Sequence, residues 1–408
     1  MLHWNRLLRI AICTSILCFI STSLLNLKYV RTCTNPSTNE HDKAIRKTPP
    51  GFYKHGTSNE TANIDNAVFG SNMTPRRNNS EYVKFRLIRS PTDHLVFHYH
   101  HILSSMKWKL NSTNMDIFRK ELSKETSLTG QEDFILTQRN TRDGDRIPYF
   151  FTATNTKTPI VYYNVTKEFL ARDVPKVSPL SGRMFPRCSV VGNSGILSNS
   201  KCGHDIDQAD YVIRSNVPQI RPHTVDAGRK SNFTTMNPSI ATRRFNKLKN
   251  KKDTVALAKI VQEYYGILWL PCLTATSSTD VCLKVKHTLE LENVRNLTAA
   301  VADPRHFLAI YNFWKQRNFT RPLSTGFYMT HLALAMCEET HLYGFWPFPY
   351  RVPDRVTDTG TNTLRKVKYH YFDNVGFSSF HSMNDEFAVL LQMHVMGILN
   401  LHTTECGV

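Results

Sequence analysis

The stretch CSVVGNSGILSNSKCGHDIDQADYVIRSN occupies residues 188–216. It opens on a β-branched run, breaks at the loop GNSG (residues 192–195), passes through a short helix-like segment and returns to an apolar run at residues 211–213. Strand, tight loop, helix and strand in this order predict the start of a parallel α/β sheet. Open α/β sheets bind nucleotides at a glycine-containing loop after the first strand, so the loop is a candidate nucleotide site. A turn that needs a positive φ explains the same four residues equally well.

Further segments extend this α/β pattern. The apolar runs at residues 233–236 and 266–270 predict two more strands, and residues 342–345 predict another. Between them, apolar residues follow helical spacing from Met329 to Cys337, with Ser324 or Thr325 as the N-cap. Residues 147–161 read as strand and turn, and residues 117–122 as an amphipathic helix. The alternation predicts a Rossmann-like α/β/α sandwich with a mostly parallel sheet, from about residue 180 to the end.

Four ordered segments resemble the motifs of one enzyme family. Residues 188–216 resemble the large sialylmotif of eukaryotic sialyltransferases, and RPLSTG (321–326) continuing to CEETHLYGFWPF (337–348) resembles the small one. YHYFD (369–373) and the spacing of His381 to Glu386 and Phe387 follow in the family's order. The wordings VVGNSGIL and YGFWPF resemble the α2,8-sialyltransferase subfamily. The resemblance covers about residue 187 to the C-terminus and adds to the fold prediction an expected activity.

The resemblance implies a donor, CMP-sialic acid, and the residues that bind it. Asn193, Ser194 and Asn216 follow predicted strands and are expected to contact the nucleotide sugar. A second helix N-terminus, whose dipole suits an anion, is expected at residues 324–326. By residue, the expected donor-binding set is Asn193, Ser194, Asn216, Ser324, Thr325, Gly326, Trp346, Tyr369 and His370. Trp346 is expected to stack on or wall the nucleotide; capping, turn and core roles explain several of these residues without any ligand.

Two histidines are expected to act in the transfer step. His381 is predicted as the general base, because a neutral imidazole with an ordinary pKa of about 6.5 accepts a proton in a slightly acidic compartment. Glu386 is expected to orient His381 or the following helix, and His370 to donate to the departing phosphate. The resemblance also implies inversion at the anomeric carbon. Because a single phosphate leaves and protein donors can neutralise it, no metal or other cofactor is expected.

Cysteine usage indicates an oxidising compartment. Of nine cysteines, six lie in the region that resembles the family, and six cysteines allow 15 pairings that spacing alone does not resolve. The resemblance implies the bridges Cys188–Cys337 and Cys202–Cys406. Cys272 and Cys282 depart from the family pattern, which leaves an extra local bridge between them open.

The N-terminus predicts a membrane anchor. Residues 10–25 are apolar and uncharged, and with flanks extended to residues 7–27 they are just long enough to cross a thin bilayer. No clean small-x-small cleavage site follows, which favours an anchor over a cleaved signal peptide. The expected organisation is a short cytoplasmic tail (1–6), an anchor (7–27), a flexible lumenal stem (28–81) and a catalytic region (82–408), in the Golgi membrane as a single-pass type II protein. Eight Asn-x-Ser/Thr sequons on the lumenal side support this orientation: Asn59, Asn72, Asn78, Asn111, Asn164, Asn232, Asn296 and Asn318.

The net charge of +18 favours anionic partners. No nucleic-acid-binding module is recognisable, and the anchor and sequons also disfavour that class of partner. Residues 243–252 carry six basic side chains; a solvated surface explains such a run, and contact with an acidic glycan or membrane surface is the second interpretation. The expected function is therefore α2,8-sialyl transfer to a sialylated glycolipid or glycoprotein acceptor. A transferase for galactose or N-acetylgalactosamine acceptors and a catalytically silent sialic-acid-binding lumenal protein are the alternatives, and a homodimer is left open.

Overall fold

The computed structural model describes residues 85–87, 91–128, 130–180, 182–353, 363–377 and 379–407. The predicted tail, anchor and stem lie outside these residues. Within the described part of the chain, none of the helices combines the length and the apolar character needed to cross a bilayer. The fold below concerns the unit that begins at Val83.

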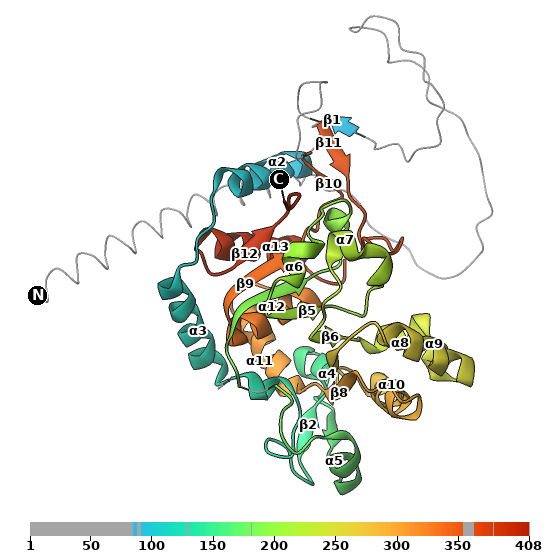
Figure 1. Ribbon diagram of the computed structural model, residues 1–408. Helices are drawn as coiled ribbons and strands as arrows, with labels where there is room; N and C mark the ends of the chain where they lie inside the picture. Colours follow the sequence, from blue (N-terminus) through green and yellow to red (C-terminus); the bar gives the residue numbers. More distant parts are fainter. Residues whose placement is uncertain are drawn as a thin grey trace, which may run out of the picture. The chain divides into compact units, whose positions relative to one another are not determined.

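A seven-stranded sheet lies at the centre of the described unit (Figure 1). All of its pairings are parallel, in the order β12-β9-β4-β5-β6-β7-β8. The strands predicted from the apolar runs are present, and the mostly parallel sheet is confirmed. The bounds are β4 Phe185–Val191, β5 Tyr211–Arg214, β6 Phe233–Thr235, β7 Gly266–Leu270, β8 Leu297–Val301, β9 Cys337–Tyr343 and β12 Asn400–His402.

The strands are apolar on both faces because helices cover both. Along β7, Ile267 and Trp269 pack into one core and Leu268 and Leu270 into another. The first core contains residues of α2 (Pro91–Ser105), α3 (Ser112–Thr126), α4 (Phe150–Thr154), α11 (Pro304–Lys315), α12 (Thr325–Met336) and α13 (Met383–Val395). The opposite cores contain residues of α5 (Lys167–Asp173), α6 (Gly203–Asp207), α7 (Thr224–Ala227), α8 (Pro238–Arg244), α9 (Lys251–Val261) and α10 (Thr279–Leu291). These layers form the predicted α/β/α sandwich.

The strand order reverses beside β4. From β4 the chain builds β5, β6, β7 and β8 outward in one direction, then returns with β9 to the other side of β4. Ligand sites of open α/β sheets lie at such a reversal, outside the carboxyl ends of the strands. The topology therefore places the expected site above Val191 and Tyr343, the last residues of β4 and β9.

Smaller elements surround the sandwich. β1 (Phe85–Leu87), β11 (Thr363–Lys366) and β10 (Tyr350–Arg351) form one antiparallel sheet, and β2 (Arg146–Pro148) pairs with β3 (Tyr162–Asn164) in another. Short 3-10 turns complete the chain at Gln131–Phe134, Gly195–Leu197, Arg221–His223, Asn246–Leu248 and Thr276–Ser278.

Three boundaries differ from the sequence predictions. The segment predicted as strand and turn contains the helix α4 between β2 and β3, because Phe150 turns into the core. The helix expected at residues 117–122 is the longer α3, which Asn111 caps through Asn114 N. Cys337 was grouped with the buried stripe of a helix, but it begins β9, since α12 ends at Met336 and passes directly into the strand.

Three disulfides link these elements. Cys188 on β4 pairs with Cys337 on β9, 149 residues later, and Cys202 pairs with Cys406, 204 residues later. Both implied bridges are thus confirmed. The local bridge that the sequence left open, Cys272–Cys282, is also formed, and it joins the loop after β7 to α10.

The sequons in the described residues differ in exposure. The side chains of Asn111, Asn164 and Asn318 are exposed. Asn296 is half-buried, and its amide nitrogen donates to the carbonyl oxygens of Gln262 and Tyr264. Because this nitrogen is the atom that a glycan modifies, Asn296 is poorly placed as an acceptor in the folded protein. Asn232 is half-buried as well, whereas Asn59, Asn72 and Asn78 lie outside the described residues.

Candidate active site

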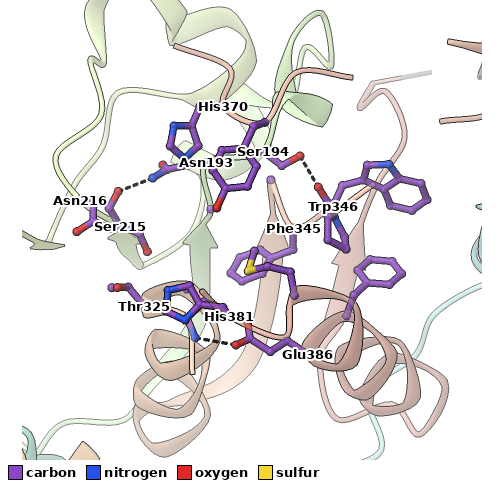
Figure 2. A pocket seen from close by; sticks show the side chains of 18 of the residues that line it. Asn193, Ser194, Ser215, Asn216, Thr325, Phe345, Trp346, His370, His381 and Glu386 are labelled. Carbon is purple, nitrogen blue, oxygen red and sulfur yellow. Dashed lines mark hydrogen bonds between the residues drawn. The ribbon is translucent and has the colours of Figure 1, made fainter. Parts of the chain in front are cut away.

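A pocket opens at the strand reversal and is lined by residues of all four sequence motifs (Figure 2). It encloses a cavity of about 150 Å³. The structure brings together every residue of the expected donor-binding set, with both candidate catalytic histidines. The lining includes the donor-binding set, Asn193, Ser194, Asn216, Ser324, Thr325, Gly326, Trp346, Tyr369 and His370, together with His381.

Two glycines allow the motifs to approach each other at the floor of the pocket. A Cβ on Gly192, after β4, would lie 2.5 Å from the carbonyl oxygen of Gly344, after β9. A Cβ on Gly344 would meet the Gly192 oxygen at the same distance, and Gly344 has φ +74°. Any side chain at either position would push apart the two strand ends that carry the pocket.

Asn193 is held by hydrogen bonds of its backbone carbonyl and of its side-chain amide nitrogen. Its Nδ2 donates to the carbonyl oxygen of Ser215 at 3.0 Å, and its own carbonyl accepts from Tyr371 N at 3.0 Å. Its Oδ1 is buried and has no partner within the described structure, and the same holds for Ser215 Oγ. An unpaired buried acceptor costs free energy, and both of these atoms belong to residues that line the pocket.

Asn216 and Asn237 connect the next two strands to α12. Asn216 has φ +65°, donates its N–H to Thr235 Oγ1 and accepts from Asn237 N at 3.1 Å. Asn237 in turn donates from Nδ2 to Thr325 Oγ1 at 3.1 Å. Asn237 is not among the site residues predicted from the sequence. Its signal was available: Asn193, Asn216 and Asn237 follow the ends of three consecutive predicted parallel strands, whose carboxyl ends share one edge.

Ser324 is the N-cap of α12, and Glu386 holds it. Ser324 Oγ accepts from Phe327 N at 3.1 Å, while its N–H and hydroxyl donate to Glu386 Oε1 and Oε2 at 2.6 and 2.5 Å. Burial raises the pKa of Glu386 to about 7, against the opposing effect of the bonds from Ser324. Glu386 was expected to orient His381 or the following helix, but its two carboxylate oxygens instead hold the N-cap of α12. The hydrogen bonds of its carboxylate are with Ser324 and not with His381.

His381 presents one ring nitrogen to the pocket. Its Nδ1 lies 2.7 Å from the carbonyl oxygen of Pro322, which accepts only if Nδ1 carries the proton. The tautomer therefore leaves a lone pair on Nε2. Burial lowers the pKa of His381, while the bond to Pro322 acts in the opposite direction. A neutral imidazole with a free Nε2 is the form that a general base requires.

His370 lies on the opposite side of the pocket from His381 (Figure 2). Its Nδ1 is 2.9 Å from Asp373 Oδ1, so the carboxylate fixes the ring and favours a proton on Nδ1. The ring of Tyr369 stacks on it at 4.5 Å, and burial raises the pKa of the Tyr369 phenol. With Nδ1 directed at Asp373, Nε2 of His370 donates a hydrogen bond only when both ring nitrogens carry a proton.

The predicted stacking role of Trp346 does not fit its orientation. Its indole is buried against Phe348 and Phe387 and donates to Tyr350 O at 2.9 Å, and Figure 2 shows the ring turned away from Asn193 and His381. Its carbonyl oxygen contributes instead by accepting the Ser194 hydroxyl at 2.8 Å. The aromatic side chain on the floor is Phe345, whose ring would lie 3.1 Å from a Cβ on Gly326.

The charges of the pocket constrain how it holds an anion. Among the described residues that line it, none is Lys or Arg. The negative charge of a bound anion would therefore be stabilised by His370, by amide donors and by the first-turn N–H groups of α12, where the helix dipole is positive. No group of three or more His, Cys, Asp or Glu side chains within the described ranges is arranged to hold a metal ion.

Comparison with known proteins identifies the family. The model of glycosyltransferase family 29 (sialyltransferase) matches residues 135–398. The chain belongs to the sialyltransferases. The match covers the central sheet except β12 and includes every residue of the pocket.

Individual relatives indicate which members of the family this chain is similar to. This sialyltransferase is 36% identical over 306 residues to alpha-N-acetylneuraminide alpha-2,8-sialyltransferase of Xenopus tropicalis, covering 73% of this chain and 81% of that protein. It is 33% identical over 309 residues to human alpha-2,8-sialyltransferase 8E, with 75% and 76% covered. Among solved structures, a mammalian sialyltransferase in complex with Gal-beta-1-3GalNAc-ortho-nitrophenol matches with 19% identity and a TM-score of 0.42, over 70% of this chain and 94% of that one. The family's donor is CMP-sialic acid and its acceptors are glycans, so the sialyltransferase is a glycosyltransferase.

Proposed function

We propose that this sialyltransferase moves sialic acid from CMP-sialic acid, with inversion, to the 8-hydroxyl of a terminal sialic acid on an acceptor glycan. The observation that carries the mechanism is the placement of two histidines on opposite sides of one pocket, each with Nδ1 fixed by an oxygen acceptor. The names of the relatives support the acceptor and the linkage.

The transfer follows from this geometry. The acceptor hydroxyl attacks the anomeric carbon, the bond from that carbon to the phosphate oxygen breaks, and the electron pair leaves with CMP. His381 Nε2 takes the hydroxyl proton, and His370, with a proton on both ring nitrogens, donates a hydrogen bond from Nε2 to the leaving phosphate from the other side. Attack opposite to the leaving group inverts the anomeric carbon. A positioned base contributes about 10²–10⁴ to the rate.

The donor would lie along the carboxyl ends of the strands. Asn193 Oδ1 and Ser215 Oγ are the buried acceptors left for donor groups of the nucleotide sugar. The N-terminus of α12, held by Glu386 and Asn237, suits the phosphate. The phosphate is already a good leaving group, so these residues and the two histidines meet the needs of the reaction.

We also propose a Golgi location with type II topology. The apolar residues 7–27 and the absence of a clear cleavage site support the anchor, and the exposed sequons Asn111, Asn164 and Asn318 support a lumenal catalytic region. A glycosidase-induced mass shift in the full chain, lost when these three sequons are removed together with those of the stem, would test it.

Product analysis tests the acceptor. With labelled donor, we expect strong preference for a sialylated acceptor over the same glycan after sialidase treatment, and a product that carries two linked sialic acids. The basic run at 243–252 and the charge of +18 predict that the acceptor's apparent affinity falls as salt rises from about 0.05 to about 0.3 M. Equal activity on exposed galactose would favour the alternative transferase, and absent transfer with intact ligand binding would favour the silent binding protein.

A further inference from the structure

Two sets of contacts hold the segment that carries His381. Toward the small motif, His381 Nδ1 donates to Pro322 O at 2.7 Å. Toward α4, the Phe380 ring contacts two others: its centroid is 4.8 Å from that of His381 and 6.1 Å from that of Phe151. The rings meet edge to face, with interplanar angles of 86° and 82°, a geometry that aromatic pairs prefer. His381 is therefore connected to α4 through Phe380.

The hydrogen bond to Pro322 does not by itself fix the plane of the His381 ring. The χ2 torsion of a histidine is broad, and a single bond at Nδ1 permits the ring to turn. The ring plane decides where the Nε2 lone pair points, and a general base must lie within hydrogen-bond reach of the proton that it takes. Edge-to-face contact with Phe380 limits this turning. The backbone next to Phe380 is held as well, since the exposed Arg321 guanidinium donates to Ser379 O.

Phe151 is held in place by the attachment of α4 to the loop after β7. The N–H groups of Phe150 and Phe151 donate to Leu273 O at 3.1 Å and to Thr274 O at 3.0 Å. The side chain of Phe150 is buried and contacts Phe307 with ring centroids 4.9 Å apart. The helix is thus anchored by its backbone and by Phe150, while Phe151, 39% exposed, contacts Phe380.

The loop that carries α4 is closed by the local disulfide. Cys272, next to Leu273, pairs with Cys282 on α10, and both cysteines are fully buried. The carbonyl oxygen of Cys272 also accepts from Ser278 Oγ at 3.4 Å and from Thr279 Oγ1 at 3.3 Å. The bridge departs from the family pattern, so the role of this loop does not follow from the motif resemblance. It restricts the two carbonyl groups from which α4 is suspended.

We propose that Phe151 is a positioning residue for His381: it supports Phe380, and the loop closed by Cys272–Cys282 holds Phe151 in place. The inference rests on the proposed function, in which His381 is the general base, and adds a support that lies outside the four motifs. Phe151 is not among the residues that line the pocket, so it acts through Phe380 and not on a ligand. A small displacement of a catalytic group is costly, because the reacting atoms must be held in register.

The support acts by packing and not by charge. The helix α4 (FFTAT) contains no titratable side chain. The titratable groups around His381 come from other elements and are Tyr369, His370, Glu386 and Arg321. Burial lowers the pKa of His381. Removing the Phe151 ring uncovers Phe380 and gives water access to the imidazole, so the pKa of His381 should rise toward its ordinary value of about 6.5.

Transfer kinetics across pH test the proposal in the full chain. Phe151→Ala should lower kcat/KM for a sialylated acceptor about tenfold through kcat and leave CMP affinity unchanged. The acid limb of the kcat/KM profile should also move to higher pH, because the neutral base is lost as pH falls through a raised pKa. Phe151→Tyr keeps the ring and should retain both the rate and the limb. Leu291→Ala, at a side chain 77% exposed at the end of α10, is the control. A fall in rate with an unmoved limb, or an equal fall in Phe151→Tyr, would overturn the proposal.

A second measurement does not depend on activity. Diethyl pyrocarbonate acylates neutral imidazoles, and peptide mass spectrometry follows the reaction of His381 as a function of pH, with the exposed His94 as internal reference. We expect faster modification and a higher midpoint pH at His381 in Phe151→Ala, and neither change in Phe151→Tyr. The double variant Cys272→Ala, Cys282→Ala should shift the midpoint in the same direction. An unmoved midpoint in Phe151→Ala contradicts the positioning role, and one in the double variant contradicts the part assigned to the disulfide.

The two proposals fail differently. If His381→Ala retains full transfer, the general base of the proposed function is wrong, whatever the modification of His381 shows. If His381→Ala loses transfer and the midpoint of His381 does not move in Phe151→Ala, only the positioning role of Phe151 is wrong.

Discussion

The two sides of the pocket differ in how their polar groups are satisfied. On the strand side, Asn193 Oδ1 and Ser215 Oγ are buried without partners in the described structure. On the helix side, Ser324 uses its N–H, its hydroxyl proton and its hydroxyl oxygen in bonds to Glu386 and Phe327. We interpret the unpaired strand-side atoms as available for a ligand and the paired helix-side atoms as part of the scaffold. The sequence motifs include residues of both kinds and do not distinguish them.

The largest effect is expected at the proposed general base, His381, which belongs neither to the unpaired strand-side atoms nor to the helix-side scaffold. His381→Ala should lower the transfer rate by about 10²–10⁴ and change CMP affinity only a few-fold, because the base acts on the acceptor proton. Initial rates and calorimetry with CMP measure the two quantities. His94→Ala, an exposed histidine on α2, is the control. Lost CMP binding in folded His381→Ala protein would move His381 to the donor cradle.

The helix side should respond in stability. Ser324→Ala removes the cap of α12 and leaves the buried Glu386 carboxylate without one of its two donors from residue 324, so the free energy of unfolding should fall by about 1–3 kcal/mol. Urea unfolding measures it. Ser382→Ala is the matched control, since Ser382 is the N-cap residue of α13 but its side chain makes no capping bond. Equal losses in both variants would contradict the scaffold role of Ser324.

The strand side should respond in ligand binding. Asn193→Ala removes a buried acceptor that we assign to the nucleotide sugar, which should weaken CMP binding about tenfold, the effect of one hydrogen bond of about 1.4 kcal/mol. Calorimetry measures it, with Asn246→Ala on the exposed turn after α8 as control. If binding is unchanged and only stability falls, the strand side is scaffold too and the comparison fails.

The smallest expected effect comes from protonation of Glu386, on the helix side of the pocket. Because the pKa of Glu386 is raised to about 7, its carboxyl gains a proton as pH falls through 7 and removes a negative charge beside the first turn of α12. CMP affinity should therefore rise a few-fold between about pH 8 and pH 6. Stability should decrease as pH rises from the ordinary 4.5 to about 7, since the charged form is penalised by burial. Glu386→Gln should flatten the pH dependence of CMP affinity; an unchanged slope would assign it to another group.

Much of the fold followed from local patterns. The strands at residues 189–191, 211–213 and 266–270 were predictable because both faces are buried, which makes the runs continuously apolar. The position of β9 between β4 and β12 was not, since pairing partners 149 residues apart leave no local signal. The resemblance to the family's motifs, which implied the bridge Cys188–Cys337, predicted that β4 and β9 lie close together.

The sequence predicted which residues lie at the pocket better than it predicted the role of each. Residues of the motifs converge on one pocket, as expected, but Trp346 turns its ring into the core and Glu386 binds a serine rather than a histidine. Spacing places a residue at the end of a strand or helix; it does not determine the rotamer, which depends on neighbours such as Phe348 and Phe387.

The arrangement of the central strands has a consequence for how the protein is made. β4 is synthesised early but receives its neighbour β9 only after 149 further residues, and β9 is flanked in turn by β12, which precedes Cys406 by four residues. During translation one edge of β4 thus stays unpaired until residues 337–343 have been made, and the outer edge of β9 stays unpaired until residues 400–402 follow. A premature stop that removed only residues 400–408 would delete β12 and the partner of Cys202 together, so truncation at this end should be as damaging as the loss of a catalytic residue.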